Sequence, residues 1–243
     1  MKNLIIVGCN GGLGSAMVDY FQDKFNLIGL SPEKNSSLAD YYFCDFLNDE
    51  SVITSCSEVC NKYSNIAGII YCSGVTIPGS PKDLSMETWD KQYAINIRGY
   101  FMIVKYLYDL ISRSPACSIV QINSKSGKKG SYKNGCYASS KFAGIGLTQS
   151  FALEFAEQGI RFNCVCPGNL LESPMWQDNL FEAYSKTQNL TKEQLYQKYV
   201  GLVPMKKGCQ YIDVINAVEF LLSNKSSYMT GQAINVTGGQ QLF

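Results

Sequence analysis

The chain has 243 residues, of which 46% are hydrophobic and 17% charged, so it is long enough for one large domain with a buried core. Its net charge of +1 gives no reason to expect nucleic acid or a membrane surface as a partner. The absence of histidine and of any C-x-x-C pair among ten cysteines excludes His-based catalysis, argues against a metal site and favours reduced thiols in the cytoplasm.

The first elements are a strand, a glycine-rich turn and a helix. Residues 3–8 form a short apolar run that is typical of a buried parallel strand and too short for a signal peptide core or a spanning helix. Glycines in the turn let the backbone approach a pyrophosphate, which the N–H groups of the following helix can bind. The dinucleotide contacts that this interpretation predicts are Gly8, Asn10, Gly11, Gly12, Leu13 and Gly14. The alternative is a glycine-rich turn that binds no ligand.

Residues 26–30 and 41–44 predict the second and third strands, joined by a crossover that is short for a parallel connection. Dinucleotide folds often carry an acidic residue for the ribose after the second strand, and here that position is Ser31. Glu33 could turn inward and bind the ribose hydroxyls, whereas Lys34 could attract a 2′-phosphate. The choice between NAD and NADP therefore stays open, with a slight preference for NADP.

Asp45 and Phe46 follow the third strand. Asp45 could hydrogen-bond an adenine amine, or it could be a helix cap or turn residue. A helix over 49–62 leads to a fourth strand over 66–71, which ends in Cys72-Ser73-Gly74. Small residues at the carboxyl end of a central strand let a ligand come close.

A long helix over residues 86–112 carries Asn96 among apolar side chains. A buried amide needs hydrogen-bond partners. Asn96 is therefore either structural or a residue that holds a water near the reacting groups.

The fifth strand, 117–123, delivers Ser124, and a helix over 136–158 carries Tyr137 and Lys141 on one face. A phenol has a pKa near 10, and an ammonium at ~4 Å favours the phenolate by on the order of 4 kcal/mol before solvent screening. We therefore predict that Lys141 lowers the pKa of Tyr137 into the range of acid–base work near pH 7. Ser124 could hold the reacting oxygen.

The sixth strand, 160–166, ends at Pro167-Gly168 and is followed by a long excursion over 169–205. Long insertions at the carboxyl end of a sheet are usually lids or substrate walls. A helix over 211–223 and a last strand over 233–236 complete the chain. The alternation predicts one α/β domain over 1–243, with a doubly wound parallel sheet of about seven strands.

Together these residues resemble the short-chain dehydrogenase/reductase family along the whole chain. The glycine-rich turn matches its cofactor turn, Asp45 its adenine-contacting aspartate, and residues 72–74 a variant of its N-A-G segment. Asn96, Ser124, Tyr137 and Lys141 match the catalytic tetrad, and residues 167–168 match the nicotinamide-side turn.

The resemblance implies a Rossmann-like fold, an NAD(P) cofactor and hydride transfer between the nicotinamide and a carbonyl or alcohol carbon. Tyr137 would be the acid in reduction and the base in oxidation, and Lys141 would also bind the nicotinamide ribose. Asn96 would keep a water in the proton path. A homo-oligomer, either a tetramer or a dimer, is implied as well. The further implied cofactor contacts are Ser31, Phe46, Cys72, Ser73, Gly74, Pro167, Gly168, Asn169 and Leu170.

From residue 119 onward the chain resembles more closely the sorbitol-6-phosphate 2-dehydrogenase branch of this family, in residues 121–128, 168–175, 203–209 and 230–240. That resemblance implies a phosphorylated ketose/polyol pair. The set expected to contact the substrate is Ser124, Lys125, Lys128, Tyr137 and Met175.

Lysines near the expected site could bind a phosphate, or they could form a solvated face. Glu172, where that branch leads us to expect a basic residue, weakens the case unless it faces outward. The lysines near the expected site are Lys125, Lys128, Lys206 and Lys207.

The alternatives to this function are a reductase of another carbonyl, such as a 3-ketoacyl thioester, and a non-catalytic dinucleotide-binding scaffold or sensor.

Overall fold

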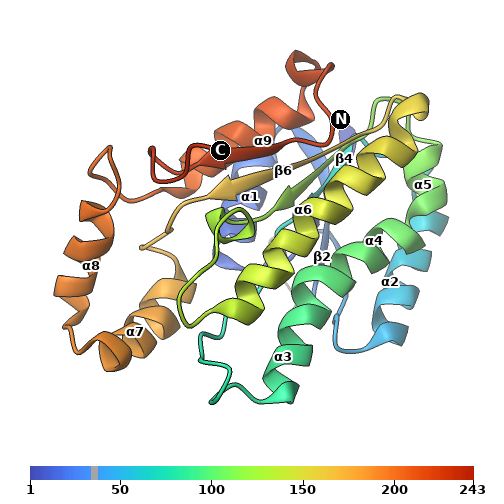
Figure 1. Cartoon of the computed structure of the whole chain (residues 1–243). Helices are drawn as coiled ribbons and strands as arrows, with labels where there is room; N and C mark the ends of the chain where they lie inside the picture. Colours follow the sequence, from blue (N-terminus) through green and yellow to red (C-terminus); the bar gives the residue numbers. More distant parts are fainter. Residues whose placement is uncertain (34–37) are drawn as a thin grey trace.

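A computed structural model describes residues 1–33 and 38–243 and shows a seven-stranded sheet between two layers of helices (Figure 1). Every strand pair is parallel, and the spatial order is β3-β2-β1-β4-β5-β6-β7. The predicted doubly wound fold is confirmed. The strands are β1 Lys2–Val7, β2 Phe25–Ser31, β3 Asp40–Phe43, β4 Gly68–Tyr71, β5 Ser118–Ile122, β6 Arg161–Pro167 and β7 Ala233–Val236.

Helices α1 and α9 cover one face of the sheet, and α2, α4 and α6 cover the other (Figure 1). No helix within residues 1–33 and 38–243 is long and apolar enough to cross a membrane. The α-helices are α1 Gly12–Phe21, α2 Asp49–Lys62, α3 Met86–Tyr93, α4 Gly99–Tyr106, α5 Tyr108–Ser112, α6 Gly135–Phe155, α7 Phe181–Gln188, α8 Lys192–Gly201 and α9 Tyr211–Leu222.

The alternation of side chains along β1 explains why both faces need a helical cover. Successive side chains of a strand point to opposite faces of the sheet. Leu4 and Ile6 pack in the core under α1 and α9, whereas Ile5 and Val7 pack in the core under α2, α4 and α6. All four are fully buried, and each such side chain contributes roughly 1.5–3 kcal/mol of hydrophobic stabilisation.

The long helix predicted over 86–112 is interrupted twice. A π-helical turn, Ala94–Arg98, separates α3 from α4, and Leu107 separates α4 from α5. The π turn contains the buried Asn96, whose side chain bonds outside the helix. Single π turns inside helices frequently occur at functional sites.

The excursion over 169–205 packs around a small core of its own. It consists of a π-helical segment, Met175–Leu180, followed by α7 and α8. Its buried side chains contact one another, so this segment forms a folded cap. The core residues are Leu171, Trp176, Leu180, Phe181 and Leu195.

Candidate active site

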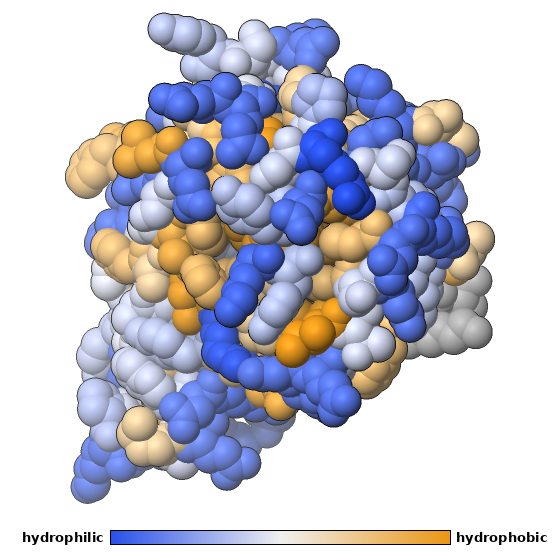
Figure 2. Space-filling model, turned by 90° about the vertical axis from the view of Figure 1, so that its right-hand side faces the viewer, coloured by the Kyte–Doolittle hydropathy of each residue, from blue (hydrophilic) through white to orange (hydrophobic). Residues whose placement is uncertain are grey.

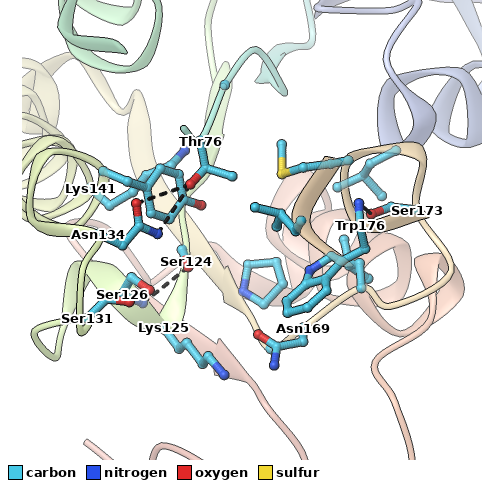
Figure 3. A pocket seen from close by; sticks show the side chains of 18 of the residues that line it. Thr76, Ser124, Lys125, Ser126, Ser131, Asn134, Lys141, Asn169, Ser173 and Trp176 are labelled. Carbon is cyan, nitrogen blue, oxygen red and sulfur yellow. Dashed lines mark hydrogen bonds between the residues drawn. The ribbon is translucent and has the colours of Figure 1, made fainter. Parts of the chain in front are cut away.

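A cavity of about 620 Å³ lies at the carboxyl ends of β1, β4, β5 and β6, under the excursion. In an open parallel sheet, ligands bind at this edge. Figure 3 shows two facing walls: Ser124, Asn134 and Lys141 on one side, and Ser173 and Trp176 on the other.

The glycine-rich turn closes one end of the cavity. Gly8 has φ +79°, and a Cβ there would come within 2.8 Å of the backbone nitrogen of Ser73. A Cβ on Gly14 would lie 2.0 Å from the carbonyl oxygen of Gly8, so the helix can pack this closely only with glycine. Helix α1 begins at Gly12, and its N-cap Gly11 supplies no capping side chain. The first N–H groups therefore face the cavity without a side-chain acceptor, an arrangement that fits a diphosphate.

The reacting groups come from the end of β5 and the first turns of α6. Ser124, Tyr137 and Lys141 all line the cavity. The Ser124 hydroxyl accepts the N–H of Ser126 at 3.1 Å. The Lys141 ammonium donates to the Ile122 carbonyl at 3.1 Å and lies 5.6 Å from the centre of the Tyr137 ring. The structure thus brings together the three residues that the sequence singled out.

The pKa values of the pair differ from the sequence-based expectation. Burial raises the pKa of Tyr137, and the Ser124 hydroxyl opposes this by lowering it. Burial also lowers the pKa of Lys141 from 10.5 to about 8, since the residue is 4% exposed and its ammonium has no carboxylate partner in the described chain. The prediction that Lys141 lowers the Tyr137 pKa is wrong for this structure, because desolvation dominates and the ammonium bonds to Ile122.

Asn96 is buried outside the cavity lining and is bonded to the protein. Its Oδ1 accepts the N–H of Val75 at 2.8 Å, and its Nδ2 donates to the Val75 carbonyl at 2.9 Å and the Ser140 hydroxyl at 3.0 Å. The side chain therefore ties the π turn to the segment after β4 and to the residue beside Lys141. These bonds fit the structural role considered for Asn96, and the role of holding a water stays a prediction.

The segment after β6 supplies the wall expected for the nicotinamide. The Nδ2 of Asn169 is buried without a hydrogen-bond partner, so it is an unused donor that a bound carbonyl group could satisfy. Gly74 also lines the cavity, where a Cβ would come within 3.2 Å of the Lys141 ammonium. These observations fit a nicotinamide cofactor. The predicted contacts that line the cavity are Gly11, Gly12, Leu13, Gly14, Cys72, Gly74, Pro167, Gly168, Asn169 and Leu170.

Several predicted adenosine-side residues lie away from the cavity. One carboxylate oxygen of Asp45 accepts the N–H of Leu47 at 2.9 Å, which is the turn role considered for it. The Phe46 ring packs 5.7 Å from that of Tyr71. Ser31 ends β2, and Lys34, which was considered for a 2′-phosphate, lies outside the described residues. Gly8, Asn10 and Ser73 also lie outside the lining.

The predicted substrate cations separate into one that lines the cavity and three that do not. Lys125 lines it and donates to the side-chain oxygen of Gln240 at 2.6 Å. Lys128 donates to the Ala233 carbonyl at 2.6 Å, so its assignment to the substrate is corrected. The Lys206 ammonium bonds the Gly201 carbonyl, and Lys207 is exposed.

Glu172 faces away from the cavity. It is exposed, and it raises the pKa of the neighbouring Tyr196 phenol, where burial is the larger cause. The concern that its carboxylate would repel a phosphate inside the pocket is thereby removed.

Sequence reasoning missed several polar and aromatic lining residues. Asn134 and Thr76 hydrogen-bond across the first wall at 3.2 Å, and Asn134 precedes Tyr137 by three positions. The excursion contributes aromatic side chains whose direction the sequence did not reveal. These are Trp176, Tyr184 and Tyr199, with Lys198 beside them.

Known proteins share this architecture. The family model adh_short_C2, described as Enoyl-(Acyl carrier protein) reductase, matches residues 26–241. Sorbitol-6-phosphate 2-dehydrogenase of Escherichia coli (strain K12) is 37% identical over 242 residues, covering 97% of this chain and 93% of that protein. A 3-oxoacyl-(acyl-carrier-protein) reductase of Buchnera aphidicola subsp. Schizaphis graminum is 30% identical over 251 residues, covering 99% and 98%.

The crystal structure of sorbitol-6-phosphate 2-dehydrogenase from Erwinia amylovora superposes with a TM-score of 0.91 at 34% identity, covering 99% of this chain and all of that one. The resemblance found in the sequence is therefore confirmed over almost the whole chain. Its fold, its site and these relatives agree that the chain belongs to the short-chain dehydrogenase/reductase family, whose members are NAD(P)-dependent oxidoreductases.

Proposed function

We propose that this chain interconverts a phosphorylated ketose and the corresponding polyol phosphate, with sorbitol 6-phosphate as the reference substrate. The observation that carries the proposal is Lys125, a half-buried cation on the cavity wall directly after Ser124. Similarity to sorbitol-6-phosphate 2-dehydrogenases over nearly the full chain supports it.

The surroundings of Lys125 favour an anionic ligand. Burial lowers the pKa of Lys125 to about 8, with a smaller effect from Lys129. Its one protein acceptor in the described chain is the neutral amide of Gln240. A phosphate would supply the missing negative charge, and charge-assisted hydrogen bonds contribute roughly 1.5–3 kcal/mol each.

The wall around Ser124 suits a polyhydroxylated chain, whereas the excursion wall is largely apolar and aromatic. Hydroxyl and amide groups line the cavity around Ser124, and they can exchange hydrogen bonds with sugar hydroxyls. The polar lining residues are Thr76, Ser126, Ser131, Asn134, Asn169 and Ser173.

The chemistry follows from three side chains. A nicotinamide cofactor, which the glycine-rich turn and Asn169 would hold, would supply the hydride donor or acceptor. In reduction, Tyr137 gives its phenolic proton to the carbonyl oxygen, and the raised pKa keeps it protonated at neutral pH. In oxidation the phenolate takes the proton back, and the role of Lys141, which lines the same cavity, is to bind the nicotinamide ribose. The Ser124 hydroxyl holds the reacting oxygen, and the excursion excludes water.

For the cofactor, we favour NADP slightly over NAD. The reason is that Ser31 at the end of β2 gives no carboxylate to repel a 2′-phosphate. Titration of the intrinsic fluorescence of Trp89 and Trp176 with both cofactors measures the preference, since Trp176 lines the cavity. Tenfold tighter binding of NAD would contradict it.

We also propose a cytoplasmic homo-oligomer, either a tetramer or a dimer. Figure 2, which looks onto the side where α2, α4 and α5 lie, shows apolar side chains exposed among polar ones. Phe101 on α4 and Leu153 on α6 are 45% and 81% exposed, and the tail ends in the exposed Leu242 and Phe243. Light scattering that gives a monomer at micromolar concentration would contradict assembly.

The function is tested by initial rates of the wild-type protein with both cofactors. Sorbitol 6-phosphate and fructose 6-phosphate are compared with sorbitol, fructose and a 3-oxoacyl thioester. We expect the phosphorylated pair to have the highest kcat/KM. Faster turnover of the thioester would establish the acyl reductase instead, and no turnover of any substrate would indicate a dinucleotide sensor or scaffold.

A further inference from the structure

The C-terminal tail reaches the substrate side of the cavity. The Lys125 ammonium donates to Oε1 of Gln240 at 2.6 Å, a contact between residues that are 115 positions apart. Figure 3 shows the Lys125 side chain running along the edge of the pocket, near Asn169 in the view. The tail thus touches the cavity-lining residue next to Ser124.

The backbone of the tail is held in a defined shape. Gly238 and Gly239 have φ of +59° and +89°, which favour glycine. The Gly238 carbonyl accepts the N–H of Met205 at 3.2 Å, and a Cβ on Gly238 would lie 2.7 Å from the Val203 side chain. The Gln240 N–H then donates to the Thr237 carbonyl at 3.1 Å. These contacts fix the tail against Val203 and Met205 at the end of the excursion, and they thereby fix the position of Gln240.

We propose that Gln240 is a positioning residue for the phosphate of the substrate, because it holds the Lys125 ammonium at the cavity edge through a neutral amide. This inference rests on the proposed function. An ammonium has three N–H donors, and Gln240 takes one of them. The other two, and the full positive charge, are left for an anion. A carboxylate at the same place would neutralise the cation and compete with the phosphate.

Two substitutions at Gln240 and one neighbouring control test the proposal. Gln240→Ala removes the acceptor, and Gln240→Glu keeps its shape but adds a negative charge. Gln241→Ala is the control, since the Gln241 side chain bonds the Phe243 carbonyl within the tail and does not line the cavity. We expect the KM for sorbitol 6-phosphate to rise about tenfold in Gln240→Ala and further in Gln240→Glu, the scale of one charge-assisted hydrogen bond. In both variants kcat and the KM for sorbitol should change less than twofold.

A second readout does not depend on turnover. Lysines are labelled with ¹³C-methyl groups, and the Lys125 signal is assigned with Lys125→Arg and followed by NMR against pH. Gln240→Glu should move the titration of Lys125 to higher pH, whereas Gln241→Ala should leave it in place. The inference would be overturned if all three variants had the wild-type KM for sorbitol 6-phosphate and if the Lys125 titration were unchanged. Equal wild-type rates with sorbitol 6-phosphate and sorbitol would overturn the proposed function instead, while the Lys125 titration still decides the contact.

Discussion

The two walls of the cavity are built differently. The catalytic wall, formed by Ser124, Tyr137 and Lys141, rests on the main sheet and on a buried amide. Asn123 accepts the N–H of Ser124 at 2.8 Å and donates to the Lys141 carbonyl at 3.0 Å, so it joins the two elements that carry the reacting groups. The excursion wall rests on its own small aromatic core, in which the Trp176 ring lies 4.9 Å from that of Tyr199.

This difference separates chemistry from recognition. The catalytic wall needs fixed spacing, because proton transfer requires its groups to stay within hydrogen-bond reach. The excursion wall can change side chains without disturbing the sheet, which is how one fold serves many substrates. Substitutions in the first wall should therefore lower turnover, and substitutions in the second should raise KM.

The largest effect should come from Tyr137→Phe. The variant keeps the ring but removes the proposed proton donor. We expect a loss of at least ~10²-fold in kcat, the low end for acid–base catalysis, with cofactor binding nearly unchanged. Steady-state kinetics and the fluorescence titration measure the two quantities. A variant that retains more than about half of the activity would show that another group moves the proton.

Lys141→Met should abolish most activity and yet stabilise the fold. The fall of the Lys141 pKa from 10.5 to about 8 by burial corresponds to about 3 kcal/mol of destabilisation at pH 7. Met removes the buried charge, so we expect a gain in the free energy of unfolding of up to about that size at pH 7.

The sign of the pH dependence gives a control for this variant. Between pH 8 and 10.5 the unfolded wild type binds more protons at this lysine than the folded protein does, so wild-type stability rises with pH. The advantage of Lys141→Met should shrink across this window, as measured by denaturant unfolding. A variant less stable than the wild type at pH 7 would contradict the account.

A smaller effect is expected in the excursion wall. Trp176→Ala removes a lining ring that also packs against Phe181 and Tyr199. We expect the substrate KM to rise about tenfold with kcat nearly unchanged, since one buried aromatic contact is lost. Leu195→Ala is the matched control, because Leu195 lies in the same core but does not line the cavity. An equal rise in KM for both variants would assign the effect to packing of the excursion rather than to contact with the substrate.

The sequence predicted the fold and the reacting groups well because both depend on local spacing. Apolar runs separated by helical patterns predicted all seven strands, and Tyr137 and Lys141 share a helix face whatever the rest of the chain does. The direction of the pKa shifts could not be predicted, because it depends on burial by distant segments.

The substrate side was less predictable for a similar reason. Lys125 and Lys128 both follow Ser124 within four positions, but the Lys128 ammonium bonds to β7 and the Lys125 ammonium bonds to the tail. The break at Asn96 was also missed, because a π turn depends on the partners of its side chain outside the helix.

The most direct test of the proposed function uses this pair of lysines. The quantity is the ratio of kcat/KM for sorbitol 6-phosphate to that for sorbitol, measured in the wild type, in Lys125→Met and in Lys128→Met. Because a charge-assisted hydrogen bond contributes roughly 1.5–3 kcal/mol, we predict a fall of about tenfold or more in Lys125→Met and little change in Lys128→Met. A ratio near one in the wild type, or a ratio unaffected by Lys125→Met, would contradict the account.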